Sequence, residues 1–177
     1  MKIGGKKVEA LAKGEVVLPR SGDGQELRLQ VRAFPLGSEE EAAKLFPTPV
    51  PPVKFATGKR GKPLRDPETH QVVKVRDLQD PDFVRESRLA NRRQMIFLIV
   101  EGLKEDPTLE WDTPRPEELT RANAGEYFDA VFAECQEAGL STGDLGLILD
   151  KIRELGNLTG AQIDEAVEDF LSEEQAV

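Results

Sequence analysis

Four amphipathic segments follow one another in the C-terminal half of the chain, and they constrain its fold more than any other feature. In each segment, apolar residues recur at intervals of three and four, which is the spacing of one helix face. Glycine or proline marks the turns between the segments. They span residues 83–103, 126–138, 141–156 and 159–171. We therefore predict a four-helix bundle-like domain over residues 81–177.

Local signals set the boundaries of these helices. Asp80-Pro81-Asp82 is typical of a helix start, because acids and proline suit the first turn. Gly102 and Pro107 are expected to end this first helix, and Ser141 to form a capping box with Asp144. The apolar run Met95–Val100 resembles a strand when taken alone. The helical periodicity on both sides of it favours one long helix.

The N-terminal part has the other periodicity, that of a β-hairpin. Apolar residues at 27, 29, 31 and 33 alternate with polar ones, and residues 21–25 are rich in turn-forming Gly and Asp. We predict a hairpin over residues 15–36, with residues 3–12 as a candidate third strand. A short helix is predicted to begin at a Ser38 cap and to end before Pro47. Because a lone hairpin is marginal in water, this one must pack on something.

A basic, proline-rich stretch separates these two parts. Residues 47–52 contain four prolines, and residues 54–76 contain seven Lys or Arg and two acids. We interpret residues 47–80 as a linker or mobile loop, with a candidate short strand at residues 72–75. The predicted fold class is therefore α+β, mainly α. It comprises a small β-rich N-terminal region (1–46), a Pro/Gly-rich basic linker (47–80) and an acidic helical domain (81–177).

The charge is divided unevenly along the chain, which bears on its partners. Residues 1–81 carry 15 Lys or Arg and 11 Asp or Glu, whereas residues 82–177 carry 9 Lys or Arg and 22 Asp or Glu. Phosphate contacts need a basic face, so the acidic half disfavours nucleic acid. The basic stretch 54–76 has Phe55 as its only aromatic residue, which favours a tether or partner-binding arm over nucleic-acid contact. It is also suited to fold onto the acidic half of its own chain or of a neighbour.

No set of residues with catalytic chemistry emerges from the sequence. Cys135 lies on an apolar helix face and is expected to be a buried core residue. His70 is expected to be exposed in the basic stretch. As the only cysteine and histidine, these two do not make a zinc site, and the single cysteine fits a reducing compartment. The longest apolar run has six residues, too few to span a membrane. We predict a cytoplasmic protein that is not an enzyme and has no cofactor or metal.

Partner-binding residues are expected among the aromatic side chains of the C-terminal half. Trp111 lies outside the helices, and two interpretations are open: a lid packed over the bundle, or an exposed anchor at a protein interface. Phe128, Phe132 and Phe170 lie on the apolar faces of two of the predicted helices. They are further candidates because amphipathic helices bind apolar partner helices through such faces.

The layout of the last hundred residues resembles the tail assembly chaperones of long-tailed (siphovirus-type) bacteriophages. Three features carry the resemblance. The first is a helix opened by Asp80-Pro81-Asp82, with Asn91-Arg92-Arg93 before its apolar run and Glu101-Gly102-Leu103 after it. The second is the nearby Glu110-Trp111, and the third is the series of helices from Glu126 through Gly139–Asp144 to Phe170-Leu171. The N-terminal strand pair and the proline-rich stretch also match loosely. The basic segment 54–76 is longer and more charged than the family pattern.

The resemblance implies a chaperone that acts in the host cell cytoplasm and is not part of the mature virion. It implies that the chain binds the tape-measure protein, keeps it soluble and helps to recruit tail-tube protein. Self-association is a further expectation. Two other classes stay open: a structural virion protein, such as a head–tail connector or tail-completion component, and a regulator that uses residues 54–76 on nucleic acid.

Overall fold

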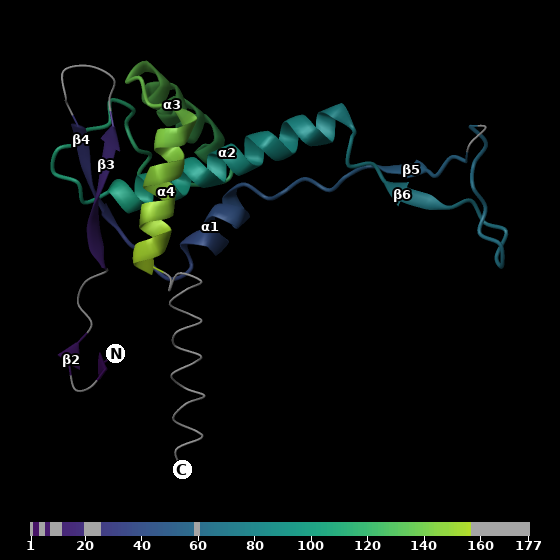
Figure 1. Ribbon diagram of the computed structural model, residues 1–177, viewed down its shortest axis with the longest axis horizontal. Helices are drawn as coiled ribbons and strands as arrows, with labels where there is room; N and C mark the ends of the chain where they lie inside the picture. Colours follow the sequence, from purple (N-terminus) through teal and green to yellow (C-terminus); the bar gives the residue numbers. More distant parts are fainter. Residues whose placement is uncertain (1, 4–5, 8–11, 20–25, 59–60, 157–177) are drawn as a thin grey trace, which may run out of the picture.

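The computed structural model describes residues 2–3, 6–7, 12–19, 26–58 and 61–156, and within them the fold is mainly α with small antiparallel β elements (Figure 1). The predicted fold class is thereby confirmed. The helices are α1 (Ser38–Leu45), α2 (Pro81–Leu103), α3 (Ala124–Glu137) and α4 (Thr142–Gly156). The strand pairs are β1 (Lys2–Ile3) with β2 (Lys6–Lys7), β3 (Lys13–Pro19) with β4 (Glu26–Arg32), and β5 (Val53–Phe55) with β6 (Lys74–Arg76).

The predicted N-terminal hairpin is the β3–β4 pair. Its register places Val16 opposite Leu29 and Leu18 opposite Leu27. Alternate residues on one face, Val16, Leu18, Leu29 and Val31, are buried, as the period-2 pattern predicted. This face packs on α2 and α4. Strands β1 and β2 pair with each other in a separate sheet, so the described part of residues 3–12 adds no third strand to the hairpin.

Helix α2 runs through the centre of the molecule. Asp80 caps it as predicted, because its side chain accepts a hydrogen bond from the Phe83 amide (2.9 Å) and Pro81 occupies the first turn. Every residue from Ile96 to Leu103 is buried. Such a continuous buried stretch requires neighbours on all sides, and the hairpin, α1, α3 and α4 supply them. The N-terminal part of α2 projects away from these elements (Figure 1).

Gly102 has a different role from the predicted one. It does not end α2, which continues through Leu103, and it is buried against Ile152 of α4. A Cβ at this position would overlap the Ile152 side chain, whose Cγ1 would be only 2.7 Å away. The glycine therefore allows α2 and α4 to approach closely. The expected Ser38 cap is also wrong: Gly37 is the N-cap of α1, and the Ser38 hydroxyl donates to the Pro35 carbonyl (2.9 Å).

Helices α3 and α4 complete the core. The capping box predicted before α4 is present: the Asp144 amide donates to the Ser141 hydroxyl (3.1 Å), and the Ser141 amide donates to the Asp144 carboxylate (2.7 Å). Leu145, Ile148 and Ile152 are buried as the helical spacing predicted. The fourth predicted helix, 159–171, lies outside the described residues.

One continuous hydrophobic cluster joins the β3–β4 hairpin to the helices. It contains Val16 and Leu29 of the hairpin together with Ile99 of α2, Phe128 of α3 and Ile152 of α4. We call this unit, strands β3–β4 with the helices, the body. The division at residues 46/47 and 80/81 stays a prediction. In the structure, described residues of the N-terminal part (1–46) and of the C-terminal part (81–177) share the core of the body.

The predicted linker contains a β-ribbon, which we call the arm (residues 53–76, of which 59–60 are outside the description). Strands β5 and β6 form its base, and further bridges join Thr57 to Pro63 and Arg65 to Val72. The candidate strand at 72–75 thus corresponds to this bridge and β6. Arm and body are connected at the N-terminal end of α2, and the arm points away from the body (Figure 1). His70 is exposed in the arm, as expected.

Candidate partner-binding groove around Trp111

The chain between α2 and α3 passes over the body as a strip, residues 106–113, and Asp106 fixes its first end. Asp106 is buried, and its Oδ2 accepts a hydrogen bond from the backbone N–H of Gln30 in β4 (2.7 Å). Its Oδ1 accepts hydrogen bonds from both the amide and the hydroxyl of Thr108 (each 2.7 Å). Burial raises the pKa of this carboxyl, but the hydrogen bonds from Thr108 and Gln30 together outweigh it and lower the pKa.

Glu134 of α3 fixes the second end of the strip. Its Oε1 accepts a hydrogen bond from the Asp112 amide (2.7 Å), and its Oε2 accepts one from the Thr113 amide (3.1 Å). Between the two anchors, Leu109 and Trp111 are half-buried and pack against the core. A carboxylate of the strip, bonded to β4, and a carboxylate of α3 therefore hold the only tryptophan of the chain in a defined place.

A groove with a volume of about 540 Å³ lies between β4, the strip and the C-terminal end of α3. We call it the Trp111 groove. Its apolar lining residues are Leu27, Leu29, Leu103, Leu109, Trp111, Cys135, Ala138 and Leu140, and its acidic ones are Glu110, Asp112, Glu134 and Glu137. Neither lysine nor arginine is among these lining residues. A second cavity, of about 360 Å³, lies on another side of Trp111 and reaches Arg115 and Tyr127.

Cys135 is buried, as the sequence predicted, and it is one of the residues that line the groove. Burial, and then the nearby negative charge of Glu134, raises the pKa of its thiol to about 11. The thiol is therefore protonated at neutral pH, and a protonated thiol is a poor nucleophile. Cys135 contributes apolar surface to the groove.

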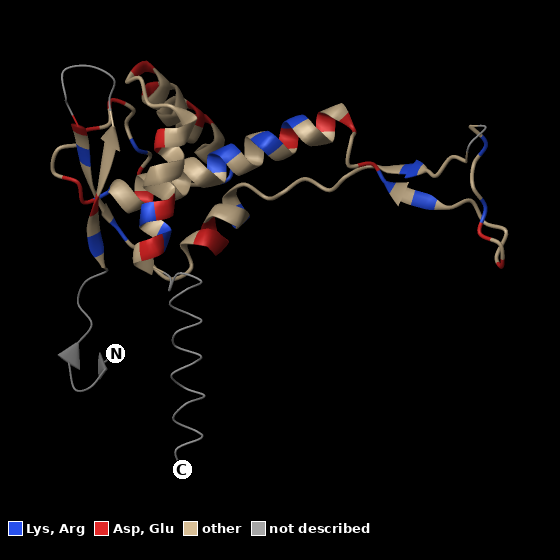
Figure 2. Ribbon diagram, viewed as in Figure 1, with Lys and Arg blue, Asp and Glu red and all other residues tan. Residues whose placement is uncertain are grey.

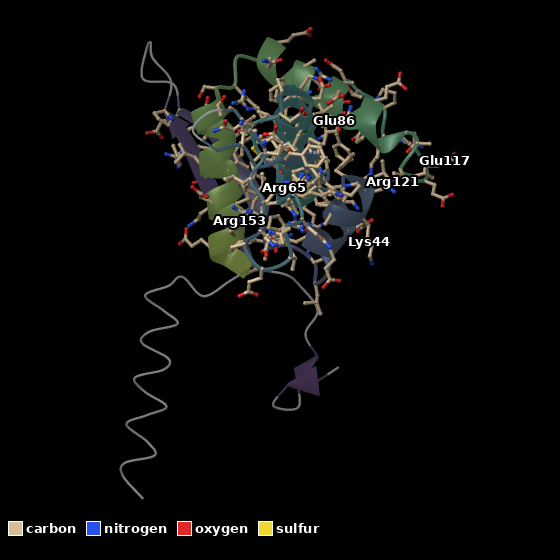
Figure 3. The ribbon with its side chains drawn as sticks, turned by 90° about the vertical axis from the view of Figure 1, so that its right-hand side faces the viewer. Lys44, Arg65, Glu86, Glu117, Arg121 and Arg153 are labelled. Carbon is tan, nitrogen blue, oxygen red and sulfur yellow. The ribbon has the colours of Figure 1, made fainter. Side chains whose placement is uncertain are left out.

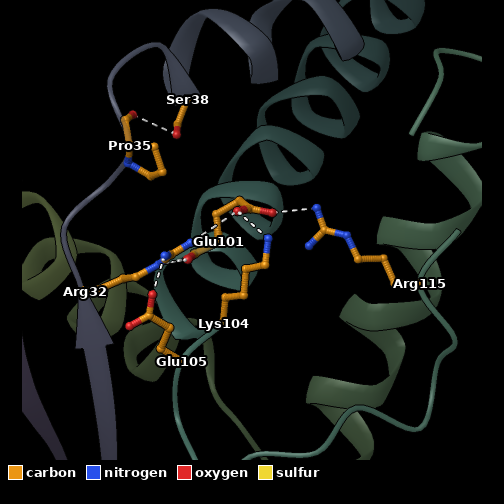
Figure 4. A network of polar contacts seen from close by, with 7 residues as sticks. All are labelled: Arg32, Pro35, Ser38, Glu101, Lys104, Glu105 and Arg115. Atoms are coloured by element: carbon orange, nitrogen blue, oxygen red, sulfur yellow. Dashed lines mark hydrogen bonds and ion pairs between the residues drawn. The ribbon is translucent and has the colours of Figure 1, made fainter. Parts of the chain in front are cut away.

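A polar network behind the strip ties three segments together (Figure 4). Glu101 of α2 is 9% exposed, and its Oε1 accepts from the Arg115 guanidinium (2.6 Å). Arg32 of β4 donates to the Glu101 carbonyl (3.0 Å) and also pairs with Glu105 (2.7 Å). A buried carboxylate needs such partners, because an unpaired one would cost several kcal/mol. The network holds β4 and the segment after Trp111 against α2.

A second charged cluster joins α2 to α3 on another side of the body. Arg92 and Arg93 both donate to Asp129, and Arg92 also lies over the Phe132 ring, 4.6 Å from its centroid. Burial raises the pKa of Asp129, but the two arginines outweigh it and lower the pKa. Arg92 and Arg93 belong to the motif behind the family resemblance, and here they bind a neighbouring helix.

The four candidate partner-binding residues have different surroundings. Trp111 lines the groove, and its half-buried position is compatible with both interpretations, lid and anchor. Phe128 is 1% exposed, and its ring meets those of Phe46 (5.7 Å), Phe97 (5.6 Å) and Tyr127 (4.8 Å). A partner reaches Phe128 only if the core opens.

Phe132 is half-buried beneath Arg92, and Phe170 lies outside the described residues. Sequence reasoning missed the two anchors of the strip, Asp106 and Glu134. The Asp-Pro-Thr sequence at 106–108 is a turn signal that could have identified the first anchor. Nothing local distinguishes Glu134 from the other acids of its helix.

Within the described ranges, no group of three or more His, Cys, Asp or Glu side chains is placed to hold a metal ion. Among the helices described, none combines the length and the apolar character needed to cross a membrane.

Compared with models of protein families, with curated proteins and with solved structures, the chain has no significant match. The resemblance to phage tail assembly chaperones therefore depends on the sequence pattern alone.

Proposed function

We propose that this protein is a phage tail assembly chaperone that holds an apolar helical segment of a tape-measure protein in the Trp111 groove. In this role it keeps the tape-measure protein soluble in the host cytoplasm, helps to recruit tail-tube subunits and is absent from the mature virion. The observation that supports the proposal is the composition of the groove, which has an apolar floor and an acidic rim.

This composition suits a client helix that would otherwise aggregate. The accessible apolar residues of the lining, Leu27, Leu109, Trp111 and Leu140, offer apolar surface to the side chains on one helix face. The acidic rim faces solvent around the client, and the chain as a whole carries a net charge of −9. Such a charge repels other copies of the complex and favours solubility. Binding of this kind requires no catalytic residue.

Co-expression with a tape-measure protein encoded beside this chain tests the proposal. We expect the client to become more soluble and to co-purify with this protein. Apolar contacts survive high salt, because salt screens charge pairs and leaves hydrophobic burial intact. Trp111→Ala should weaken binding by about 2 kcal/mol, or roughly 30-fold, if Trp111 is an interface anchor. The matched control is Leu36→Ala, which removes a fully exposed apolar side chain outside the groove.

Two results would count against this function. The first is a client that stays insoluble and does not co-purify. The second is client binding that Trp111→Ala leaves unchanged per folded molecule while the melting temperature falls. That second result would make Trp111 a lid and would remove the groove from the proposal.

A structural virion protein is the second candidate, and the arm favours it. A helical body with a projecting arm also fits such a protein, and the arm presents exposed Val53 and Phe55 side chains that a neighbouring subunit could cover. Mass spectrometry of purified virions separates the two classes: a virion component is present in stoichiometric amounts, and a chaperone is absent. A stable ring formed without any client would also favour the structural class.

A further inference from the structure

The arm carries apolar surface that the body does not cover. Val53 is 63% exposed and Phe55 58% exposed, and Val75 and Leu64 are exposed as well. A two-stranded ribbon is marginal in water without a surface to pack on. Exposed apolar residues on such a ribbon indicate a binding surface.

The register of the arm divides its side chains between two faces. Val53 lies opposite Arg76, and Phe55 lies opposite Lys74. Because directly opposed residues and residues two apart point to the same side, these four side chains share one face. We call it the Phe55 face; it is apolar in one strand and basic in the other. Lys54 lies on the other face, where it pairs with Asp77 (2.8 Å).

The Trp111 groove is complementary to the Phe55 face both in apolar surface and in charge. Its floor is apolar, and its rim carries the exposed acids Glu110, Asp112 and Glu137, with neither lysine nor arginine among the lining residues. Figure 2 shows the Lys and Arg residues of β6, the strand that supplies the basic half of this face. Val53 and Phe55 match the floor, and Lys74 and Arg76 match rim carboxylates such as Glu110 and Glu137. Opposite potentials steer two surfaces together and suppress wrong partners.

The position of the arm directs it to another molecule. The arm joins the body at Pro81, the first residue of α2, whereas Leu103 in the groove is the last residue of this helix. A 23-residue helix is about 35 Å long, so the length of α2 separates the base of the arm from the groove. The arm also points away from the body, and Figure 3, which looks along it from the side of its tip, has Arg65 in front of the body.

We propose that the Phe55 face of one copy docks in the Trp111 groove of a second copy. Such a contact is between two different surfaces, so two copies can exchange arms reciprocally. This small oligomer is compatible with the chaperone function, whereas a closed ring of several copies would favour the structural class. The inference stands apart from the proposed function, because it requires no client. If both hold, arm and client use the same groove.

Charge reversal on the full chain tests this contact by sedimentation velocity. We expect self-association of the wild type at micromolar concentration. The arm variant Lys74→Glu/Arg76→Glu and the groove variant Glu110→Lys/Glu137→Lys should each weaken it at least about tenfold. A mixture of the two variants should associate again, because each acidic arm then meets a basic groove and each basic arm an acidic one. Phe55→Ser should weaken association without any change of charge.

Two controls make the same changes of charge at exposed positions elsewhere. They are Lys44→Glu/Arg153→Glu for the arm variant and Glu39→Lys/Glu41→Lys for the groove variant, and both should associate as the wild type does. A wild type that stays monomeric overturns the proposal. The proposal is also overturned if the arm variant associates as strongly as the wild type. It is overturned as well if the two controls weaken association as much as the arm and groove variants do. Because the arm lies outside the core, Phe55→Ser tests the contact even if the groove variant does not fold.

Discussion

Replacing Asp106 by Asn tests how the strip that carries Trp111 is held. The two side chains have nearly the same shape, but an amide has one acceptor oxygen where the carboxylate has two. In the structure, Oδ1 accepts two hydrogen bonds from Thr108 and Oδ2 accepts one from the Gln30 amide. The best orientation of the substituted side chain keeps both Thr108 bonds and turns its NH₂ group toward the Gln30 N–H. One bond is then lost, and two donors face each other.

The expected cost follows from these contacts. A hydrogen bond to a charged group contributes about 1.5–3 kcal/mol, and the two retained bonds weaken when the acceptor is neutral. Because the site is near the surface, water compensates part of this loss. We expect Asp106→Asn to lower the free energy of unfolding by about 2–3 kcal/mol. For a chain of this size the melting temperature should fall by roughly 4–12 °C.

The assay is urea unfolding followed by circular dichroism and by the fluorescence of Trp111, the only tryptophan. Asp112→Asn, the same change at an exposed acid of the same strip, is the matched control. The folded pKa of Asp106 is lowered, so its contribution is present above the unfolded value of about 3.9 and is lost as the pH falls through the folded pKa. The difference between wild type and variant should thus shrink below about pH 4. Equal stability of the two Asn variants at pH 7 would refute the reasoning.

Three further changes test other parts of the structure. Ser141→Ala removes the capping box of α4 and should cost about 1 kcal/mol in urea unfolding; a change near zero would show that the cap contributes nothing. Gly102→Val forces a side chain into Ile152 and should cost about 3 kcal/mol; a variant as stable as the wild type would contradict the close approach of α2 and α4. The Cys135 thiol, with its pKa of about 11, should react with a thiol reagent far more slowly in the folded chain at pH 7 than in urea. Equal rates would show that it is not buried.

The elements of the body that depend on local periodicity could be predicted from the sequence. The alternation at residues 27–33 specifies a half-buried strand, and the three- and four-residue spacing around Ile96 specifies a helix in spite of its strand-like apolar run. Caps such as Asp80 and the box at Ser141 act within one helical turn. In each case the signal lies within a short stretch of sequence, even where the packing that it serves is with distant residues.

The remaining features depend on contacts between residues far apart in sequence. Gly102 has the signature of a helix terminator, and only the position of Ile152, fifty residues later, turns it into a packing residue. The ribbon of the arm forms between two segments that are rich in proline, glycine and charge, so neither has a clear strand pattern. Of the candidate partner residues, Trp111 lies in the groove. Phe128 has the same apolar spacing as its neighbours, and that spacing does not distinguish a core face from a binding face.

The groove itself is assembled from three distant parts of the chain. Leu29 comes from the hairpin, Leu103 from the end of α2 and Leu140 from the turn after α3. The same hairpin inserts Val16, Leu18, Leu29 and Val31 into the core, and burial of each such side chain contributes about 1.5–3 kcal/mol. Together this is comparable to the whole stability of a typical domain, about 5–15 kcal/mol. Folding of the body and formation of the groove are therefore coupled, because the strand that forms one wall of the groove is also part of the core.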